Sequence, residues 1–114
     1  MGPGAKLLAA FAALLPLCVS AQTPTALDLF VRADKGHCIA CHQLPDGAGP
    51  ATKGNLGPKL VGERMRSLGK TALRETIRDA TRANPDTTMP PFARHHILEA
   101  AEIDRIVDFL HALP

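Results

Sequence analysis

The sequence feature that most constrains this chain is the motif C-x-x-C-H, formed by Cys38-Ile39-Ala40-Cys41-His42. The pattern is typical of covalent haem attachment. Its spacing lets two thiols add to the two vinyl groups of one haem, and the histidine that follows is placed to bind the iron from one side. The motif predicts one haem c (iron), attached through Cys38 and Cys41 and ligated by His42.

Other uses of such a motif fit the sequence less well. A thioredoxin-like redox site needs a βαβ surround, and no alternating apolar pattern predicts a strand. A structural zinc site needs four ligands, and no fourth ligand clusters with the two cysteines and His42. An exported chain would ordinarily form a disulfide here, but the histidine directly after Cys41 favours haem.

The first 21 residues predict a secretory signal peptide. One cation, Lys6, precedes an apolar run over residues 7–17, and small residues follow up to Ala21. The run is too short to cross a membrane core that needs roughly 20 helical residues. A lipoprotein with an acylated Cys18 is disfavoured by the bulky Leu17. We expect export to the periplasm and cleavage after Ala21, which leaves residues 22–114 as one cytochrome domain.

Composition excludes several kinds of partner. Without Lys6 the mature chain keeps 12 basic and 11 acidic side chains, and they are interspersed. No basic block could hold nucleic acid or an anionic membrane, so we expect neither. The chain has four Phe, one of them in the predicted signal peptide, and no Trp or Tyr. Small domains with so little apolar material often need a metal or another staple, and a haem would supply the missing core.

Three segments carry helical patterns, namely residues 25–35, 71–82 and 99–111. In the first, apolar residues recur at the spacing of one helix face, with Thr25 as N-cap. Thr71 is the expected N-cap of the second helix. Glu99 and Glu102 favour the start of the third through the helix dipole. The sequence predicts an all-α, small class I-like cytochrome c fold, with three main helices and long loops wrapped around one haem.

Two Pro- and Gly-rich loops, residues 43–65 and 84–96, connect these helices. A haem-ligating histidine needs its other ring nitrogen held, usually by a backbone carbonyl. The Gly57-Pro58 turn of the first loop is a suitable source. We therefore predict that the carbonyl of Pro58 accepts a hydrogen bond from His42.

The second loop supplies the predicted distal ligand, Met89. Two prolines follow it and stiffen the loop that would hold its sulfur against iron. His95 and His96 lie in the same loop and remain alternative ligands. The other candidates are interpreted as packing or surface residues: Met65, His37 and His111.

Several segments resemble the SoxX family of sulfur-oxidation cytochromes in order and spacing. The most specific is N-P-x-T-x-M-P-P-F at residues 84–92, followed by R-H-x-I-L at 94–98. The resemblance runs from about Gly36 to Leu110. The chain departs from the family at three positions, where the family often has Asn, Gly, and Ser or Thr: His37, Ala93 and Glu99.

The resemblance implies a periplasmic subunit of an L-cysteine S-thiosulfotransferase. Its expected partners are a SoxA-like c-type cytochrome in a heterodimer, a SoxYZ-like carrier protein that receives thiosulfate on a cysteine, and a downstream electron-acceptor cytochrome. By resemblance, Cys38 and Cys41 carry haem, and His42 and Met89 are the axial ligands. Both mature cysteines are consumed by haem, so we expect no catalytic residue here and place the catalytic cysteine on the partner chain. The alternative is a free periplasmic electron shuttle.

Overall fold

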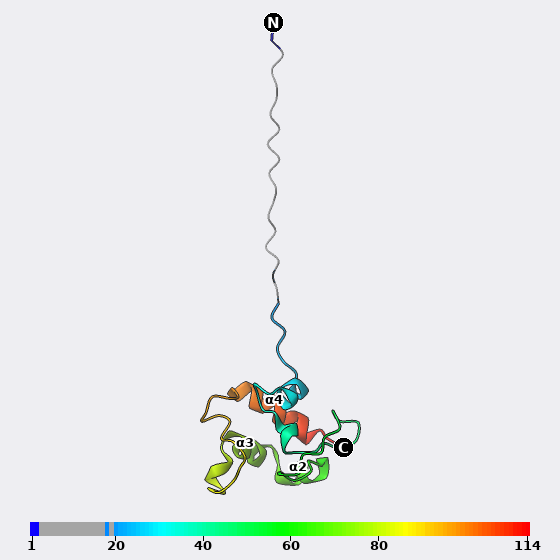
Figure 1. The fold of residues 1–114 in the computed structure, drawn as a ribbon, viewed down its shortest axis with the longest axis vertical. Coiled ribbons are helices and arrows are strands. Elements are labelled where there is room, and N and C mark those ends of the chain that lie inside the picture. The colour runs from blue at the N-terminus through cyan, green and yellow to red at the C-terminus, as the bar shows by residue number, and fades with distance from the viewer. Residues whose placement is uncertain (3–17, 19) are drawn as a thin grey trace.

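The computed structural model describes residues 1, 2, 18 and 20–114 (Figure 1). The predicted signal peptide therefore lies almost entirely outside the described residues and stays a prediction. In the part that is described, no helix is both long enough and apolar enough to span a membrane.

The described residues form four α-helices and two short 3-10 turns, with no strand among them, so the all-α prediction is confirmed. The α-helices are α1 (Ala26–Val31), α2 (Gly62–Leu68), α3 (Lys70–Arg78) and α4 (Ala100–His111). The 3-10 turns are η1 (Cys38–Ala40) and η2 (Ala80–Arg82).

Besides the three predicted helices, the described residues contain a further short helix, α2, which begins inside the segment assigned to the first loop. The buried residues of α2 are Gly62 and Met65 alone. Two such positions leave no recurring apolar pattern that could distinguish a helix from a loop. The backbone of this helix is pinned instead by a remote contact, in which the Gly62 amide donates to the Pro114 carbonyl at 2.8 Å.

Helix ends were predicted with mixed success. Thr25 caps α1 in a reciprocal capping box with Asp28, and Glu99 precedes α4 in a second such box. Thr71 is not an N-cap, which corrects that prediction. Gly69, at φ 81°, closes α2 and opens α3, so the helix starts one residue before Thr71. Only a residue that tolerates this left-handed geometry allows so abrupt a junction.

The core is built on α4, which contacts α1, α2 and α3 (Figure 1). Five side chains are essentially fully buried, two from α1 and three from α4: Leu29, Phe30, Ile103, Ile106 and Val107. The rings of Phe30 and Phe109 meet edge to face with centroids 5.9 Å apart. This packing fixes α1 on α4 and so positions the segment that follows α1, where the C-x-x-C-H motif lies.

An ion pair fastens the same segment to α4. Lys35, after the end of α1, lies 2.9 Å from the carboxylate of the buried Glu102. Burial acts to raise the pKa of Glu102, but hydrogen bonds from the Glu99 amide and Lys35 outweigh it and hold the pKa below its usual value. The carboxylate is therefore ionised at neutral pH and ties the start of the motif loop to the central helix.

Candidate haem site

The C-x-x-C-H motif forms a tight turn directly after Gly36. A Cβ atom at Gly36 would lie 2.9 Å from the Cys38 sulfur and 3.0 Å from the Leu29 carbonyl oxygen, so only glycine fits between the helix and the motif. His37 then adopts a left-handed conformation at φ 44°, and η1 follows. The His42 amide donates to the Cys38 carbonyl at 2.8 Å, which closes the turn. The turn brings Cys38, Cys41 and His42 to one cavity.

Two adjoining cavities form the centre of the site, with volumes of about 380 and 320 Å³. Each lies within the roughly 300–1,000 Å³ typical of ligand pockets. Both are lined by the same five residues: Cys38, His42, Pro58, Met89 and Phe92. The first extends along the motif turn, and the second extends among apolar side chains of all four helices. Together they provide a continuous apolar space in which the motif side chains are accessible.

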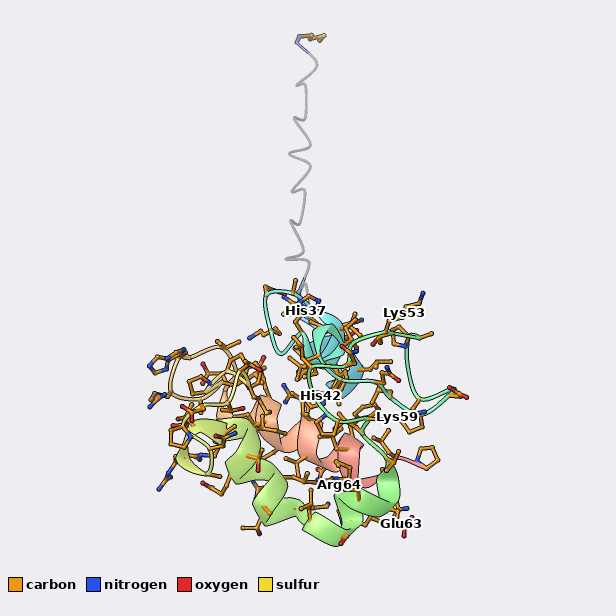
Figure 2. All side chains as sticks on the ribbon, turned by 60° about the horizontal axis from the view of Figure 1, so that its bottom comes forward. His37, His42, Lys53, Lys59, Glu63 and Arg64 are labelled. Carbon is orange, nitrogen blue, oxygen red and sulfur yellow. The ribbon has the colours of Figure 1, made fainter. Side chains whose placement is uncertain are left out.

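The imidazole ring of His42 is held through its Nδ1 atom, which leaves Nε2 unengaged. Its Nδ1 lies 2.8 Å from the carbonyl oxygen of Pro58 and donates to it (Figure 2 labels His42). Because Nδ1 is engaged, Nε2 is the nitrogen left to bind iron. The adjacent Gly57 amide donates to the Cys41 carbonyl at 2.9 Å. The first loop therefore supports the imidazole through the residue that the sequence singled out, Pro58.

Thr52 is a second support that sequence reasoning missed. Its hydroxyl lies 3.2 Å from the Ile39 carbonyl oxygen and 3.3 Å from the His42 carbonyl oxygen. The same oxygen accepts a hydrogen bond from the Gly54 amide at 3.2 Å. One side chain thus joins the wrapping loop to both ends of the motif turn. A lone threonine in a loop carries no periodic signal, so only its position in the wrapping loop could have indicated this role.

Met89 lines both cavities, as His42 does. The backbone amide of Met89 donates a hydrogen bond to the Thr87 hydroxyl at 3.2 Å. The loop is anchored farther on by the buried Phe92 and by a hydrogen bond of 3.1 Å from the Ala93 amide to the Arg78 carbonyl. The loop thus presents a thioether to the space that His42 also faces.

The other candidate ligands lie in different surroundings. Met65, in α2, is 3 % exposed and lines the second cavity but not the first. His37 is exposed and lines the first cavity beside Cys38. His95, His96 and His111 line neither cavity. Of the predicted site residues, the structure gathers Cys38, Cys41, His42, Pro58 and Met89 around the first cavity. Their roles as attachment sites and ligands stay predictions.

The environment of Cys38 disfavours any role as a nucleophile. Burial raises the pKa of its thiol to about 12. A reactive cysteine needs a lowered pKa, because the thiolate is the nucleophile. A partly buried thiol at the wall of an apolar cavity instead suits a structural bond to a group inside that cavity.

These observations fit a haem. The cavities are apolar, two thiols stand three residues apart at the wall, and an imidazole and a thioether border the same space. His and Met are the axial ligands found in cytochromes c. At Gly57, a Cβ atom would approach the imidazole within 2.3 Å, so the backbone is packed directly on the ring of His42. The fold and the site together define a c-type cytochrome domain.

Comparison with known families agrees with this class. The family model described as "Cytochrome C oxidase, cbb3-type, subunit III" matches residues 26–110, and the chain belongs to this family. It is therefore a c-type cytochrome domain, in which covalent haem c and haem-based electron transfer are implied. No curated protein matches the chain.

Proposed function

We propose that this chain is a monohaem, SoxX-type subunit of an L-cysteine S-thiosulfotransferase, exported to the periplasm after cleavage at Ala21. The observation that carries the proposal is the placement of Met89. It lies in the segment that most specifically resembles SoxX, residues 84–92, and it lines both cavities together with His42. The proposed role is electron transfer during the oxidative conjugation of thiosulfate to a cysteine of a carrier protein.

The residues of the site have separate tasks in this function. A bound haem c would supply reversible one-electron chemistry. Cys38 and Cys41 would hold it covalently, and His42 and Met89 would offer one nitrogen and one sulfur from opposite loops. The carbonyl of Pro58 fixes the orientation of the His42 ring and increases its basicity. Apolar side chains such as Phe30 and Ile106 exclude water from the second cavity.

The bond-making part of the reaction is assigned to another chain. Cys38 and Cys41 are the only cysteines of residues 22–114, and both line the first cavity. No further thiol remains to attack a sulfur substrate. We therefore assign the catalytic cysteine to a SoxA-like c-type cytochrome that forms a heterodimer with this chain. A SoxYZ-like protein would receive the thiosulfate, and a downstream cytochrome would receive the electrons.

Reconstitution tests this division of labour. The mature holoprotein is mixed with a SoxA-like cytochrome and a SoxYZ-like carrier, and thiosulfate-dependent reduction of an electron acceptor is followed. We expect activity only when all three proteins are present, together with co-elution of the two cytochromes. The protein alone, denatured, should react with no thiol reagent.

A variant of His42 tests whether the activity depends on the haem or only on the surface of the protein. His42→Ala should abolish acceptor reduction without changing the number of titratable thiols. A holoprotein that exchanges electrons but neither binds the SoxA-like chain nor supports thiosulfate conjugation would instead be a free electron shuttle. Full thiosulfate-conjugating activity of this chain alone would overturn the proposal.

A further inference from the structure

A hollow of about 250 Å³ lies where the end of α3, the turn η2 and the second loop meet. Apart from Ala93, every residue that lines it is charged: Glu75, Arg78, Asp79, Arg82 and Arg94. None of these residues lines either cavity of the candidate haem site. Figure 1 shows α3 and the second loop at the left of the view and the first loop at the right. The hollow is therefore separate from the site already described.

The charges of this hollow come together only in the folded chain. Arg78 ends α3 and Arg82 ends η2, whereas Arg94 belongs to the second loop. The Ala93 amide donates a hydrogen bond to the Arg78 carbonyl at 3.1 Å and so fastens the loop against the helix. Charges that are interspersed along the sequence thus place three guanidinium groups and two carboxylates around one hollow.

The three guanidinium groups are only loosely paired. Carboxylate oxygens lie 4.0, 3.9 and 3.6 Å away in the pairs Arg78–Glu75, Arg82–Glu75 and Arg94–Asp79, respectively. A charge-assisted hydrogen bond is about 2.7–2.9 Å long, so none of these contacts is one. By contrast, Arg74 on the same helix lies 2.6 Å from Asp104. Two of the three cations share one carboxylate, and no cation of the hollow is held by a tight ion pair.

The Asp79 carboxylate is also engaged elsewhere in the chain. It accepts hydrogen bonds from the Thr81 backbone amide at 3.1 Å and from the Thr81 hydroxyl. Arg94 in turn donates to that hydroxyl oxygen at 3.4 Å. The side chains of Arg78, Arg82 and Arg94 are 50, 77 and 58 % exposed, respectively. Positive charge therefore exceeds negative charge at an accessible surface, where part of the negative charge is already in use.

Three kinds of anionic partner can be compared at this surface. A small inorganic anion gains little at side chains so exposed, because water and salt screen the attraction. A phosphate chain or an anionic membrane carries negative charge throughout and would be repelled by Glu75 and Asp79. The surface of a folded protein can place carboxylates opposite the arginines and a polar or basic side chain opposite Glu75. Docking would also remove water from the guanidinium groups, and arginine is among the residues that contribute most to protein interfaces.

We propose that Arg78, Arg82 and Arg94 form a docking surface for a protein partner that presents a carboxylate-rich patch. The partner meets the molecule on the face formed by the end of α3 and the second loop, which also carries Met89. The fork of N–H donors on each arginine matches the two oxygens of a partner carboxylate. The inference goes beyond the proposed function and holds whether or not the chain takes part in sulfur oxidation.

The test uses the mature holoprotein and double variants that each remove two positive charges. Arg82→Gln with Arg94→Gln removes them from the hollow. The matched control, Lys53→Gln with Lys59→Gln, removes them from exposed positions of the first loop (Figure 2 labels both lysines). The probe is a fluorescently labelled oligoglutamate peptide, which represents the acidic patch. We expect binding to weaken about tenfold in the arginine variant only, as for the loss of two exposed charge pairs.

Two further measurements locate the contact and check the fold. Addition of the peptide should shift the amide NMR signals of Ala93 and its neighbours, whereas sodium sulfate at the same ionic strength should leave them in place. Arg82→Lys with Arg94→Lys should keep most of the affinity, because it keeps the charge. Arg82→Gln alone, at the most exposed of the three arginines, should give a smaller loss. Unchanged visible spectra and melting temperatures show that the variants are folded.

Several results would overturn the proposal. One is equal weakening in the arginine and lysine variants, and another is a set of shifts centred on the first loop. Sulfate that reproduces the shifts caused by the peptide would identify a small-anion site instead. Tight binding to phosphatidylglycerol vesicles that is lost in the arginine variant would identify a membrane contact. Because no measurement involves thiosulfate, failure of the proposed function would leave this test intact.

Discussion

Gly57 lies directly against the ring of His42. A Cβ atom on Gly57 would come within 2.3 Å of Cε1, 2.5 Å of Nδ1 and 2.7 Å of Nε2. The next residue, Pro58, accepts the hydrogen bond from Nδ1. The Gly-Pro pair thus sets both the distance and the orientation of the predicted iron ligand, and even a methyl group at residue 57 must displace the ring or the loop.

Gly57→Ala should therefore disturb His42 more than any other small change in this loop. Overpacking of this kind costs about 1–3 kcal/mol. We expect less covalent haem per polypeptide and a shifted Soret band in the protein that does carry haem. The control is Gly47→Asn, at φ 80° with open space around it, since Asn tolerates this conformation. Equal haem content and spectra in the two variants would contradict the proposed contact.

Met89 and Met65 can be distinguished by a pair of substitutions. Met89→Ala should abolish the weak near-infrared sulfur-to-iron band of the oxidised protein. Met65→Ala should keep that band but lower the free energy of unfolding by about 2–5 kcal/mol, as expected for truncation of a buried side chain. Persistence of the band in Met89→Ala would refute the ligand assignment and return attention to His95 and His96.

Thr52→Val keeps the shape of the side chain but removes the hydroxyl that joins the loop to the motif turn. Loss of these hydrogen bonds should lower the free energy of unfolding of the holoprotein by about 1–3 kcal/mol, measured by urea denaturation. The Gly54 amide should also exchange with solvent faster. Thr71→Val, at an exposed position of α3, is the control and should change stability little. A Thr52→Val protein as stable as this control would show that the hydroxyl is dispensable.

Glu102 predicts an acid-sensitive link between α4 and the motif loop. Its pKa is lowered in the folded protein, so its contribution to stability is present above the usual value of 4.5 and is lost as the pH falls through the lower folded value. Glu102→Gln should flatten the fall in melting temperature over this acidic range. Glu63→Gln, at an exposed position, should leave the pH profile unchanged. Identical profiles for both variants would argue against the link.

The elements that the sequence predicted are those whose signals are local. Thr25 and Asp28 form a capping box three residues apart, and the apolar spacing of α4 follows one helix face. Pro58 was predicted because a histidine after C-x-x-C needs an acceptor and a Gly-Pro turn offers an exposed carbonyl. In the structure, this carbonyl lies 2.8 Å from Nδ1 of His42.

The elements that the sequence did not predict depend on remote contacts. The start of α2 is held by Pro114, about half the chain away, and its few buried residues form no pattern. The junction at Gly69 depends on a backbone conformation that residue type permits but does not require. Thr52 acts through two carbonyl oxygens of a turn that is not adjacent in sequence. Such contacts become visible only once the chain is folded.

The close packing of His42 against Gly57 and Pro58 has a consequence for the rate of electron transfer. A ligand that can neither tilt nor slide keeps its geometry when the charge of the group that it holds changes. If His42 holds a haem, little energy would be spent on rearranging its surroundings when an electron arrives or leaves, because the dipole of the Pro58 carbonyl is already in place. The crowding that leaves no room for a methyl group thus favours rapid exchange in both directions.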